Sequence, residues 1–400
     1  MRALAFAARC LSRQPGRTAL AILGVAAVGA LLFDMLLLSR GLVVSFRDLL
    51  DSVGFDVRVM ATDATPFGGP RMPHSAAIAG ELAALPEVAG VTPILMTYAE
   101  VDRARGRPVG LSLMGIDPGG RRPWTIMTGQ DLEPQAEGMP ATLLISKALA
   151  ARLEASPGDE IAMRAVCAPN RAALPPMPFR IQGVADFPFD DAEELSAAAL
   201  RTSVATACGD EGDEADMLLI ASREGHGTGA AVAAIKRRRP DLYPVTNEQI
   251  VARMEDSGFT YFRQISTVLS AITMLFGFLL MTVLLTVSVH QRLAEIAALR
   301  ALGLSRARMA ADVLSQSVLL VGCGGALAVP LGLGLSEWLD AILKAMPGIP
   351  AALHFFVFEP RALALHGALL AVTAVLAAVY PMWLVATLPI ATTLRNEVVS

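Results

Sequence analysis

The chain has 400 residues, of which 54% are hydrophobic and only 18% are charged, and its formal net charge is −4. Together with a mean hydropathy of +0.52, this composition excludes an ordinary soluble protein and predicts a membrane protein. A net charge this small creates no global field that would attract nucleic acid, so we expect no nucleic-acid partner.

Four segments are long and apolar enough to cross a bilayer, which requires about 20 helical residues. The first follows a short N-terminal segment, 1–17, and carries one acidic residue, Asp34, near its far end. A cleavable signal peptide is the alternative for this segment, but the apolar run continues well beyond the small residues at 27–30, which favours a retained span. The predicted spans cover residues 18–41, 263–289, 311–336 and 362–388.

Basic residues in the short loops predict the orientation of these spans. The loop 337–361 contains only Lys344 and Arg361. Four arginines precede the first span, and four more lie in the segment 290–310 between the second and third spans: Arg2, Arg9, Arg13, Arg17, Arg292, Arg300, Arg306 and Arg308. We therefore expect both termini, including the tail 389–400, to be cytoplasmic, and 337–361 to be a short outer loop.

The segment 42–262 is large enough for a folded domain on the outer side. Short apolar runs bounded by Gly, Pro and Asp predict strands at 55–61, 108–116, 159–166, 179–187 and 215–222. Apolar spacing of three and four residues predicts helices at 75–86, 144–156, 229–239 and 246–263, the last leading directly into the second span. The predicted fold is a membrane α-helical protein with four transmembrane helices and a large α+β extracytoplasmic domain inserted between helices 1 and 2.

No catalytic motif stands out in the chain. We find no phosphate-binding loop, no H-E-x-x-H pair, no C-x-x-C and no nucleophile elbow, and 223–229 has the composition of a turn. The outer histidines, His74, His226 and His354, lack a second ligand type at metal spacing. Cys167 and Cys208 could pair in an oxidising compartment, but the sequence does not show that the two sulfurs approach.

The sequence pattern predicts an amphipathic helix within the segment 290–310. Leu293, Ile296 and Ala297 line one side, Gly303 can supply the left-handed residue that ends the helix, and Ser305 can cap the next one. A helix fixed between two spans could transmit a push from the cytoplasm to both of them. It could equally rest on the lipid surface with its arginines at the head groups, and the residues alone favour neither interpretation.

The segment "QRLAEIAALRALGLSRARM" (291–309) resembles the R-x-x-E-I-x-x-L-R-A-x-G-x-S motif that follows the second span in the FtsX-like permease family of ABC transporters. This family, of type VII, includes relatives such as the macrolide exporter MacB and the lipoprotein-release permeases. Residues 113–119, 143–163 and 179–187 resemble its MacB-like periplasmic core domain, and 380–397 resemble the end of its fourth span. One departure is Met382, Trp383 and Leu384, which stand where the family commonly has a basic pair.

The resemblance implies a permease subunit of the bacterial inner membrane that is not itself an enzyme and binds no cofactor. ATP and Mg²⁺ would be held by a separate cytoplasmic ABC ATPase, and two permease chains, identical or related, would pair. Glu295 and Arg300 would be available for ion pairs with the ATPase, and Leu299 for apolar contact. The full set of residues implied to lie on this coupling helix is Arg292, Glu295, Ile296, Leu299, Arg300 and Gly303.

The implied function is ATP-driven movement of the outer domain, for export or extraction of a lipid, lipoprotein or other amphipathic substrate, with a periplasmic adaptor or lipoprotein as a further partner. One alternative is mechanotransmission that regulates an extracytoplasmic hydrolase or sensor without transport. Another, a membrane-anchored enzyme, lacks a visible catalytic constellation.

Within the third span, Gly322 and Gly325 are expected to allow close helix packing, and Pro330 a kink. Asp34 is either an interfacial residue, which we favour, or one side of a polar contact between subunits.

Overall fold

The computed structural model describes residues 9, 12, 15–63, 69–102, 107–117, 121–133, 140–167, 174–209, 213–257 and 260–387. The chain divides into two compact units, which we call the helical unit and the α+β unit. The helical unit contains residues 1–42, 259–342 and 354–400, and the α+β unit contains residues 43–258 and 343–353. The expected tail, 389–400, and most of the segment 1–17 lie outside the described residues.

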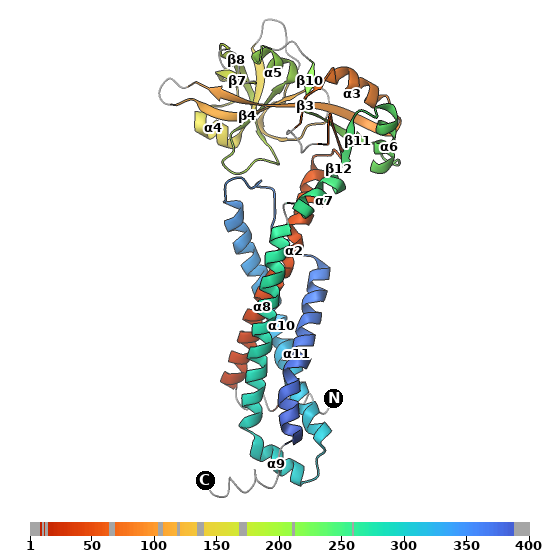
Figure 1. Ribbon diagram of the computed structural model, residues 1–400. Helices are drawn as coiled ribbons and strands as arrows, with labels where there is room; N and C mark the ends of the chain where they lie inside the picture. Colours follow the sequence, from red (N-terminus) through yellow and green to blue (C-terminus); the bar gives the residue numbers. More distant parts are fainter. Residues whose placement is uncertain are drawn as a thin grey trace. The chain divides into compact units, whose positions relative to one another are not determined.

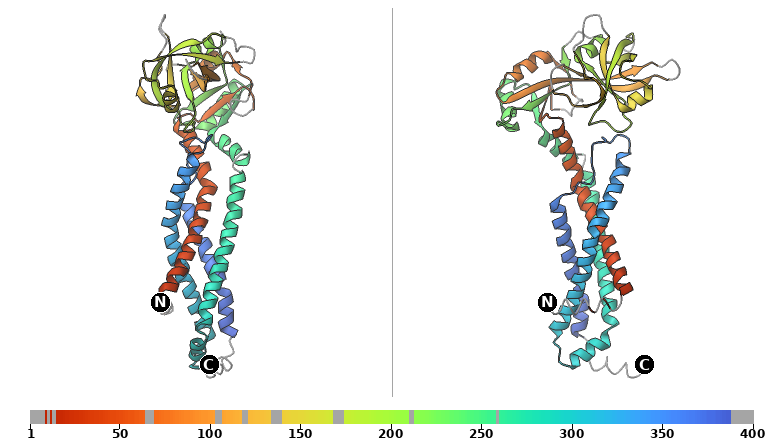
Figure 2. Two further views of the ribbon diagram at one scale, coloured as in Figure 1. Left: turned by 90° about the vertical axis from the view of Figure 1, so that its left-hand side faces the viewer. Right: turned by 180° about the vertical axis from the view of Figure 1, so that it is seen from behind.

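Long apolar helices run side by side in the helical unit (Figures 1 and 2). They are α2 (Pro15–Ser52), α8 (Thr260–His290), α10 (Arg306–Lys344) and α11 (Pro360–Thr387). Each contains a segment long and apolar enough to cross a membrane, which confirms the four predicted spans. Two helices are longer than expected, since α2 continues past residue 41 and α10 includes residues 337–344 of the expected outer loop.

Small residues set how closely these helices pack. A Cβ atom added to Gly324 of α10 would lie 2.5 Å from Val25 Cγ1 of α2, so only glycine allows this approach. The same region forms an apolar cluster to which all four helices contribute. Its buried members are Ala21, Val25, Met281, Leu285, Leu320, Val321, Ala374, Ala377 and Ala378.

The α+β unit is organised around one large sheet with the strand order β12-β1-β11-β3-β4-β9-β6-β8-β5. The strands are β1 (Val57–Met60), β3 (Val88–Val101), β4 (Val109–Ile116), β5 (Thr125–Gly129), β6 (Ala141–Ser146), β7 (Glu160–Val166), β8 (Met177–Asp186), β9 (Ser196–Leu200), β11 (Met217–Ser222) and β12 (Tyr243–Thr246). A second, two-stranded sheet pairs β2 (Met72–Pro73) with β10 (Glu214–Ala215). The pairs β4·β9 and β6·β8 are parallel, and the other pairs of the large sheet are antiparallel.

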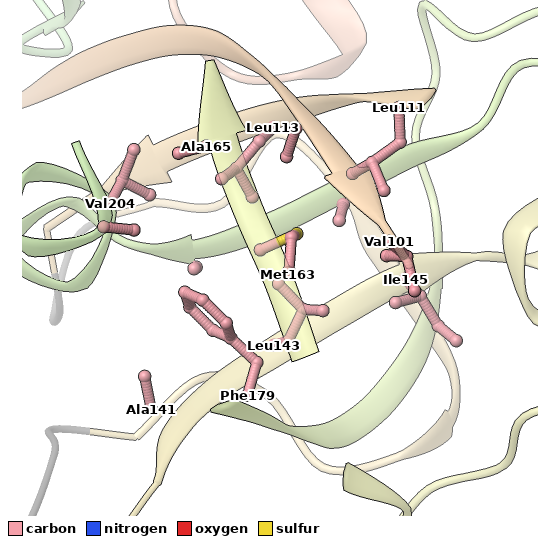
Figure 3. Packing of buried hydrophobic residues seen from close by; sticks show 14 of the residues in the cluster. Val101, Leu111, Leu113, Ala141, Leu143, Ile145, Met163, Ala165, Phe179 and Val204 are labelled. Atoms are coloured by element: carbon pink, nitrogen blue, oxygen red, sulfur yellow. The ribbon is translucent and has the colours of Figure 1, made fainter. Parts of the chain in front are cut away.

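Strand β7 closes part of this sheet on itself, because it pairs with both β3 and β8. The ring runs β3-β4-β9-β6-β8-β7 and back to β3. Side chains at alternate positions of these strands point to one shared interior (Figure 3). Leu113, Leu143, Met163 and Phe179 are fully buried there, so the ring encloses a packed core.

Short helices complete the α+β unit. They are α3 (Ser75–Ala83), α4 (Lys147–Leu153), α5 (Arg201–Ala207), α6 (Thr228–Arg238) and α7 (Asn247–Ser257). The expected helix 246–263 is represented by α7 and the start of α8, and residues 258 and 259 between them lie outside the described residues. Residues 224–226 form the turn predicted for 223–229, and the last two residues of that segment already belong to α6.

The structure confirms the five predicted strands as β1, β4, β7, β8 and β11, and two predicted helices as α3 and α6. The single helix predicted over 144–156 is wrong in its first residues. Leu144 and Ile145 are fully buried in strand β6. Ser146 then caps α4, since its Oγ accepts a hydrogen bond from the Leu149 N–H at 3.2 Å. Burial inside the sheet outweighs the helical spacing of these residues.

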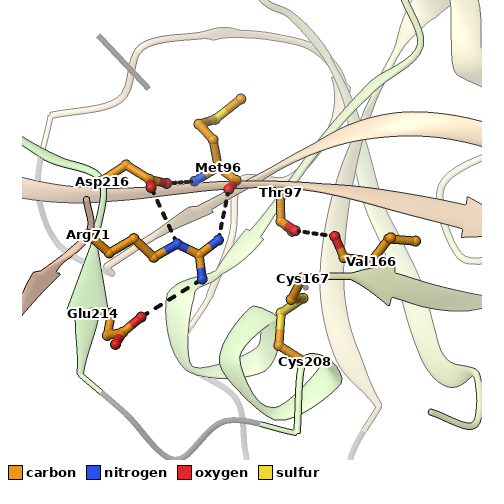
Figure 4. The surroundings of a disulfide bond; sticks show 8 residues. All are labelled: Arg71, Met96, Thr97, Val166, Cys167, Cys208, Glu214 and Asp216. Carbon is orange, nitrogen blue, oxygen red and sulfur yellow. Dashed lines mark hydrogen bonds and ion pairs between the residues drawn. A yellow bond between two sulfur atoms is a disulfide. The ribbon is translucent and has the colours of Figure 1, made fainter. Parts of the chain in front are cut away.

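A disulfide joins Cys167, just after β7, to Cys208 at the C-terminal end of α5 (Figure 4). The two Cα atoms are 5.5 Å apart. The pairing that the sequence left open is therefore present. Close by, the Thr97 hydroxyl donates to the Val166 carbonyl at 3.1 Å, which ties β3 to the end of β7.

Candidate functional site

The short helix α9 (Leu293–Ala301) lies at one end of the helical unit, between the end of α8 and the start of α10 (Figure 1). The start of α2 and the end of α11 lie toward the same end (Figures 1 and 2). Gly303 has a φ of +95° and ends the helix, as expected. Ser305 caps α10, since its Oγ accepts from the Arg308 N–H at 3.4 Å.

The inner side of α9 packs against three long helices. Ile296 and Leu299 contact a cluster made by Val289 of α8, Met309 and Val313 of α10, and Val385 of α11, together with Leu293 and Leu304. Arg300 adds a polar link, because its Nη1 donates to the Val385 carbonyl oxygen at 3.3 Å. A force on α9 therefore acts directly on the ends of α8, α10 and α11.

The outer side of α9 carries the groups that a partner could reach. Glu295 is exposed, and so are Arg306 and Arg308 at the start of α10. Leu302 is 81% exposed, whereas the other leucines of the loop are partly buried. The resemblance to the family implied an apolar contact of Leu299 with the ATPase, but in this chain Leu299 packs inward. Leu302, which follows the last residue of α9, is better placed because its side chain is exposed, and no sequence signal marked it, since its exposure depends on where the chain turns after Ala301.

Several of the residues expected on the coupling helix, including Arg292, line a small void beside α9. Arg292 is the N-cap residue of α9 and is partly buried. With Glu295, Ile296 and Leu299 it lines a small void of about 30 Å³ that also touches Asp312 of α10. A void of this size holds about one water molecule. The described part of the loop thus offers a packed support and an exposed face, with no room for a larger ligand in this void.

The three residues expected to shape the third span also differ from one another. A Cβ atom added to Gly325 would lie 2.7 Å from Leu370 Cδ1 of α11, so this glycine permits close packing. Gly322 has nothing within 4 Å of such an atom and lines a groove of about 390 Å³ between α10 and α11. Pro330 is exposed and lies inside α10, which remains helical on both sides of it.

Asp34 lies in the interior of the helical unit. It is fully buried, and a Cβ atom added to Gly332 of α10 would lie 3.5 Å from its Oδ1. The interfacial position that we favoured is therefore wrong, because helix packing within this one chain covers the side chain. Nearby, His366 of α11 is 2% exposed, and its ring centroid is 5.2 Å from that of Phe33. Among the described residues, neither Asp34 nor His366 has a hydrogen-bond partner.

Two family models match the chain. Residues 18–238, more than half of it, match the MacB-like periplasmic core domain. Residues 267–390 match the FtsX-like permease C-terminal model. The chain belongs to the FtsX-like, MacB-like permeases of ABC transporters. Membership of this family, together with four apolar helices, indicates a protein of the inner membrane. Permeases of this family work with a separate cytoplasmic ABC ATPase.

Three solved structures are similar to part of this FtsX-like permease. The periplasmic region of MacB from Actinobacillus actinomycetemcomitans is 11% identical, covers 52% of this chain and 99% of its own, and has a TM-score of 0.38. The extracellular domain of the transporter YknZ from Gram-positive bacteria is 13% identical, with coverages of 48% and 99% and a TM-score of 0.34. A permease-protein domain from Porphyromonas gingivalis is 14% identical, with coverages of 48% and 87% and a TM-score of 0.31. Comparison with curated protein sequences gives no significant match.

The residues described in this permease contain no group of three His, Cys, Asp or Glu side chains that could hold a metal ion. His354 instead contacts one carboxylate, with its Nδ1 3.0 Å from Asp340 Oδ2. His74 has a left-handed backbone and precedes α3. Our candidate functional site is the exposed face around α9, because this helix packs against three spans and carries exposed side chains.

Proposed function

We propose that this chain is the transmembrane subunit that converts ATP hydrolysis by a separate cytoplasmic ATPase into movement of its own periplasmic domain. The observation that carries the proposal is the packing of α9 against the ends of α8, α10 and α11. A helix held in this way moves three spans when a partner pushes it. In this proposal the chain itself hydrolyses no ATP and binds no cofactor.

The exposed face of α9 is the proposed docking surface. Leu302 would enter an apolar groove of the ATPase, and Glu295 would contribute an ion pair at its edge. Arg300 has a second role, since its guanidinium is bonded to the Val385 carbonyl and can transmit the contact to α11. If α9 faces the cytoplasm, as this proposal requires, both termini are cytoplasmic as well.

The proposed cargo is a lipid, lipoprotein or other amphipathic molecule that is exported or extracted from the membrane. A second permease chain, identical or related, would complete the transporter, and a periplasmic adaptor or lipoprotein could bind the outer domain. Support for an amphipathic cargo comes from the family, whose members include lipoprotein-release permeases, and from a largely apolar cavity in the α+β unit.

Co-purification tests this proposal. Wild-type chain in mild detergent should retain an ATPase, identified by mass spectrometry and by ATP hydrolysis in the eluate. The double variant Glu295→Lys, Leu302→Asp should lose it. A matched control, Glu160→Lys with Met127→Asp, makes the same two charge changes at exposed positions of the α+β unit and should retain it.

Two outcomes would contradict the proposal. One is a wild-type chain that retains no ATPase under conditions where it remains folded. The other is equal retention by the loop variant and the control variant, which would return α9 to the lipid surface.

A further inference from the structure

A cavity of about 340 Å³ lies inside the α+β unit, apart from the candidate coupling surface. Its volume falls within the range typical of small-molecule sites, about 300 to 1,000 Å³. Most of its lining is aliphatic or thioether, and the main contributors from the sheet are Ile94, Met96, Met114, Met217 and Leu219. Unbranched methionine side chains adapt to flexible hydrocarbon ligands. The cavity is thus suited to a hydrocarbon chain.

Helices connected to the membrane spans also line this cavity. Phe46, Leu50 and Val53 come from the last turns of α2 and from the residue that follows it, and Ile250 comes from α7. The helix that provides the first span therefore also provides one wall of the cavity. Ligand in the cavity would contact the C-terminal end of that helix.

One carboxylate in the lining has an unused bonding position. Asp190 Oδ2 is buried and has no hydrogen-bond partner among the described residues. The Ser196 side chain bonds to the carboxylate, and the Asp190 carbonyl accepts from the Ala351 N–H at 2.9 Å. The Asp190 backbone is therefore held in place while one of its carboxylate oxygens remains unsatisfied. A buried polar atom without a partner is costly, and such atoms mark candidate binding sites.

The uncompensated charge in the cavity is negative. Glu194 also lines it, and Asp186 and Asp191 add negative charge close to Asp190. The cation in the lining, Arg58, already has partners.

Arg58 Nη1 donates to Asn247 Oδ1, and Asp51 provides a nearby negative charge. Asn247 is itself fixed, because its Nδ2 donates to Asp51 Oδ1 at 2.7 Å and to the Phe55 carbonyl at 3.0 Å. Arg58 therefore belongs to a complete network, whereas Asp190 does not. A cationic head group would complement the cavity, and an anionic one would meet Asp190 and Glu194.

We propose that this cavity binds the hydrocarbon chain of a single-chain amphiphile whose head group is a protonated amine, with Asp190 as its counter-charge. A chain on the order of ten carbons matches the volume, if a methylene group occupies about as much space as a water molecule. The proposal deepens the proposed function by naming a class of cargo, and it rests on that function only for the step of transport. Binding itself requires no ATPase.

Tryptophan fluorescence of the full chain in nanodiscs tests this site. The sequence has three tryptophans, and Trp338 and Trp383 are 62% and 60% exposed, so both can be replaced by Phe. The remaining Trp124 packs against Phe187, with ring centroids 5.9 Å apart, and Phe187 lines the cavity. A bromine-tagged dodecylamine should quench Trp124 saturably, because bromine quenches tryptophan only at short range.

Two variants distinguish the contribution of the amine head group to binding from that of the hydrocarbon chain. Asp190→Asn keeps the shape and should weaken binding of the amine probe by about tenfold or more, as for loss of a charged hydrogen bond. Binding of the matching bromine-tagged dodecanol should change less than about twofold, which also shows that the variant is folded. Ser112→Phe fills the cavity and should abolish quenching by both probes, whereas Thr125→Phe, at an exposed position of β5, should leave it intact.

Absence of saturable quenching, or full quenching in Ser112→Phe, would overturn the proposal. Equal weakening of both probes by Asp190→Asn, or no effect on the amine, would overturn the role of Asp190. Competition by unlabelled lysophosphatidylethanolamine would support a lipid as the source of the amine, and competition by dodecylamine alone would support a simple alkylamine. Loss of the ATPase in co-purification changes none of these results, so the two proposals fail independently.

Discussion

Arg201 in the α+β unit and Asp34 in the helical unit are both buried charged residues, but their surroundings are opposite. Arg201 is 8% exposed and donates to Asp117 Oδ1 at 2.8 Å, to Asp117 Oδ2 at 3.0 Å and to Asp213 Oδ1 at 2.6 Å. Asp34 is fully buried, and neither of its carboxylate oxygens has a hydrogen-bond partner among the described residues. Arg201 thus has hydrogen-bonded carboxylates that balance its charge, whereas the carboxylate of Asp34 has no partner among the described residues.

This contrast separates structural from functional burial. A charge with all its partners fixes neighbouring elements, here β4, α5 and the segment before β10. A buried charge without partners destabilises the state in which it is observed, so such residues concentrate where the molecule binds something or changes conformation. Asp190 of the α+β unit is intermediate, because Ser196 bonds to its carboxylate but Oδ2 has no partner among the described residues, and it lines the cavity.

The largest expected effect is loss of the Arg201 network. Arg201→Met keeps most of the side-chain volume but leaves Asp117 and Asp213 without their common cation, and should destabilise the α+β unit by about 3 to 5 kcal/mol. Arg164→Ala is the control, because Arg164 and Asp102 form a partly exposed pair at 3.0 Å that contributes about 0 to 1 kcal/mol. Thermal unfolding of the full chain in nanodiscs measures both. Equal shifts in Tm would contradict the distinction.

Loss of the disulfide should cause the next largest decrease in stability. Replacing Cys167 and Cys208 together by Ala opens a link between residues 41 positions apart, which should cost about 2 to 4 kcal/mol through the entropy of the unfolded chain. Wild type treated with a reductant should show the same fall in Tm as the double variant. A double variant that unfolds at the wild-type temperature would show that the packing of α5 alone holds this region.

Asp34→Asn should increase the stability of the protein, in contrast to the two preceding changes, which decrease it. Removing an uncompensated charge from the interior of a membrane bundle should stabilise the helical unit by about 2 kcal/mol. Asp48→Asn, at an exposed position of the same helix, is the matched control and should change little. A destabilised Asp34→Asn variant would show that Asp34 has a cation partner in the assembled transporter, which would move it into the same group as Arg201.

The last expected effect is a pH dependence at Asp190. Burial raises the pKa of this carboxyl from its ordinary value of 3.8 to about 7, with Glu194, Asp191 and Asp186 adding to the rise and the Ser196 hydrogen bond opposing it. Because the folded state holds this proton more tightly than the unfolded state, stability falls as the pH rises from about 4 to about 7.

Asp190→Asn removes that dependence. Its Tm should therefore exceed that of wild type more at pH 8 than at pH 5. An advantage that is equal at both pH values, or larger at pH 5, would show that the carboxyl is ionised in the folded protein throughout this range.

Residue patterns predicted those helices and strands in which tertiary contacts agree with the local sequence preference. The length of an apolar span is a local signal, and so is a short apolar run bounded by Gly, Pro or Asp. The structure confirms the spans and the strands β1, β4, β7, β8 and β11 that these signals predicted. The longest strand, β3, was missed because Pro93 interrupts its pattern, yet Pro93 lies opposite Leu218 in the sheet. Its pairing with β4, β7 and β11 outweighs the local signal.

At the candidate site the sequence located the helix but not its two faces. The spacing of Leu293, Ile296 and Ala297 predicted an apolar side, and the structure shows that this side is buried, with Leu293 and Ile296 packing against α8, α10 and α11. Leu302 was not selected, because its exposure depends on where the chain turns after Ala301. The roles of Arg292, Glu295, Leu299 and Arg300 toward an ATPase stay predictions.

The sequence by itself determined four apolar spans, an α+β domain between the first two, and a helical loop with a family motif, because hydrophobic length, periodicity and turn residues are properties of short segments. Only the tertiary structure decided which strands close into a ring, that Asp34 lies inside the bundle, and that Asp190 faces a cavity. These features depend on contacts between residues far apart in the chain, where packing sets the solvation and the partners of each side chain.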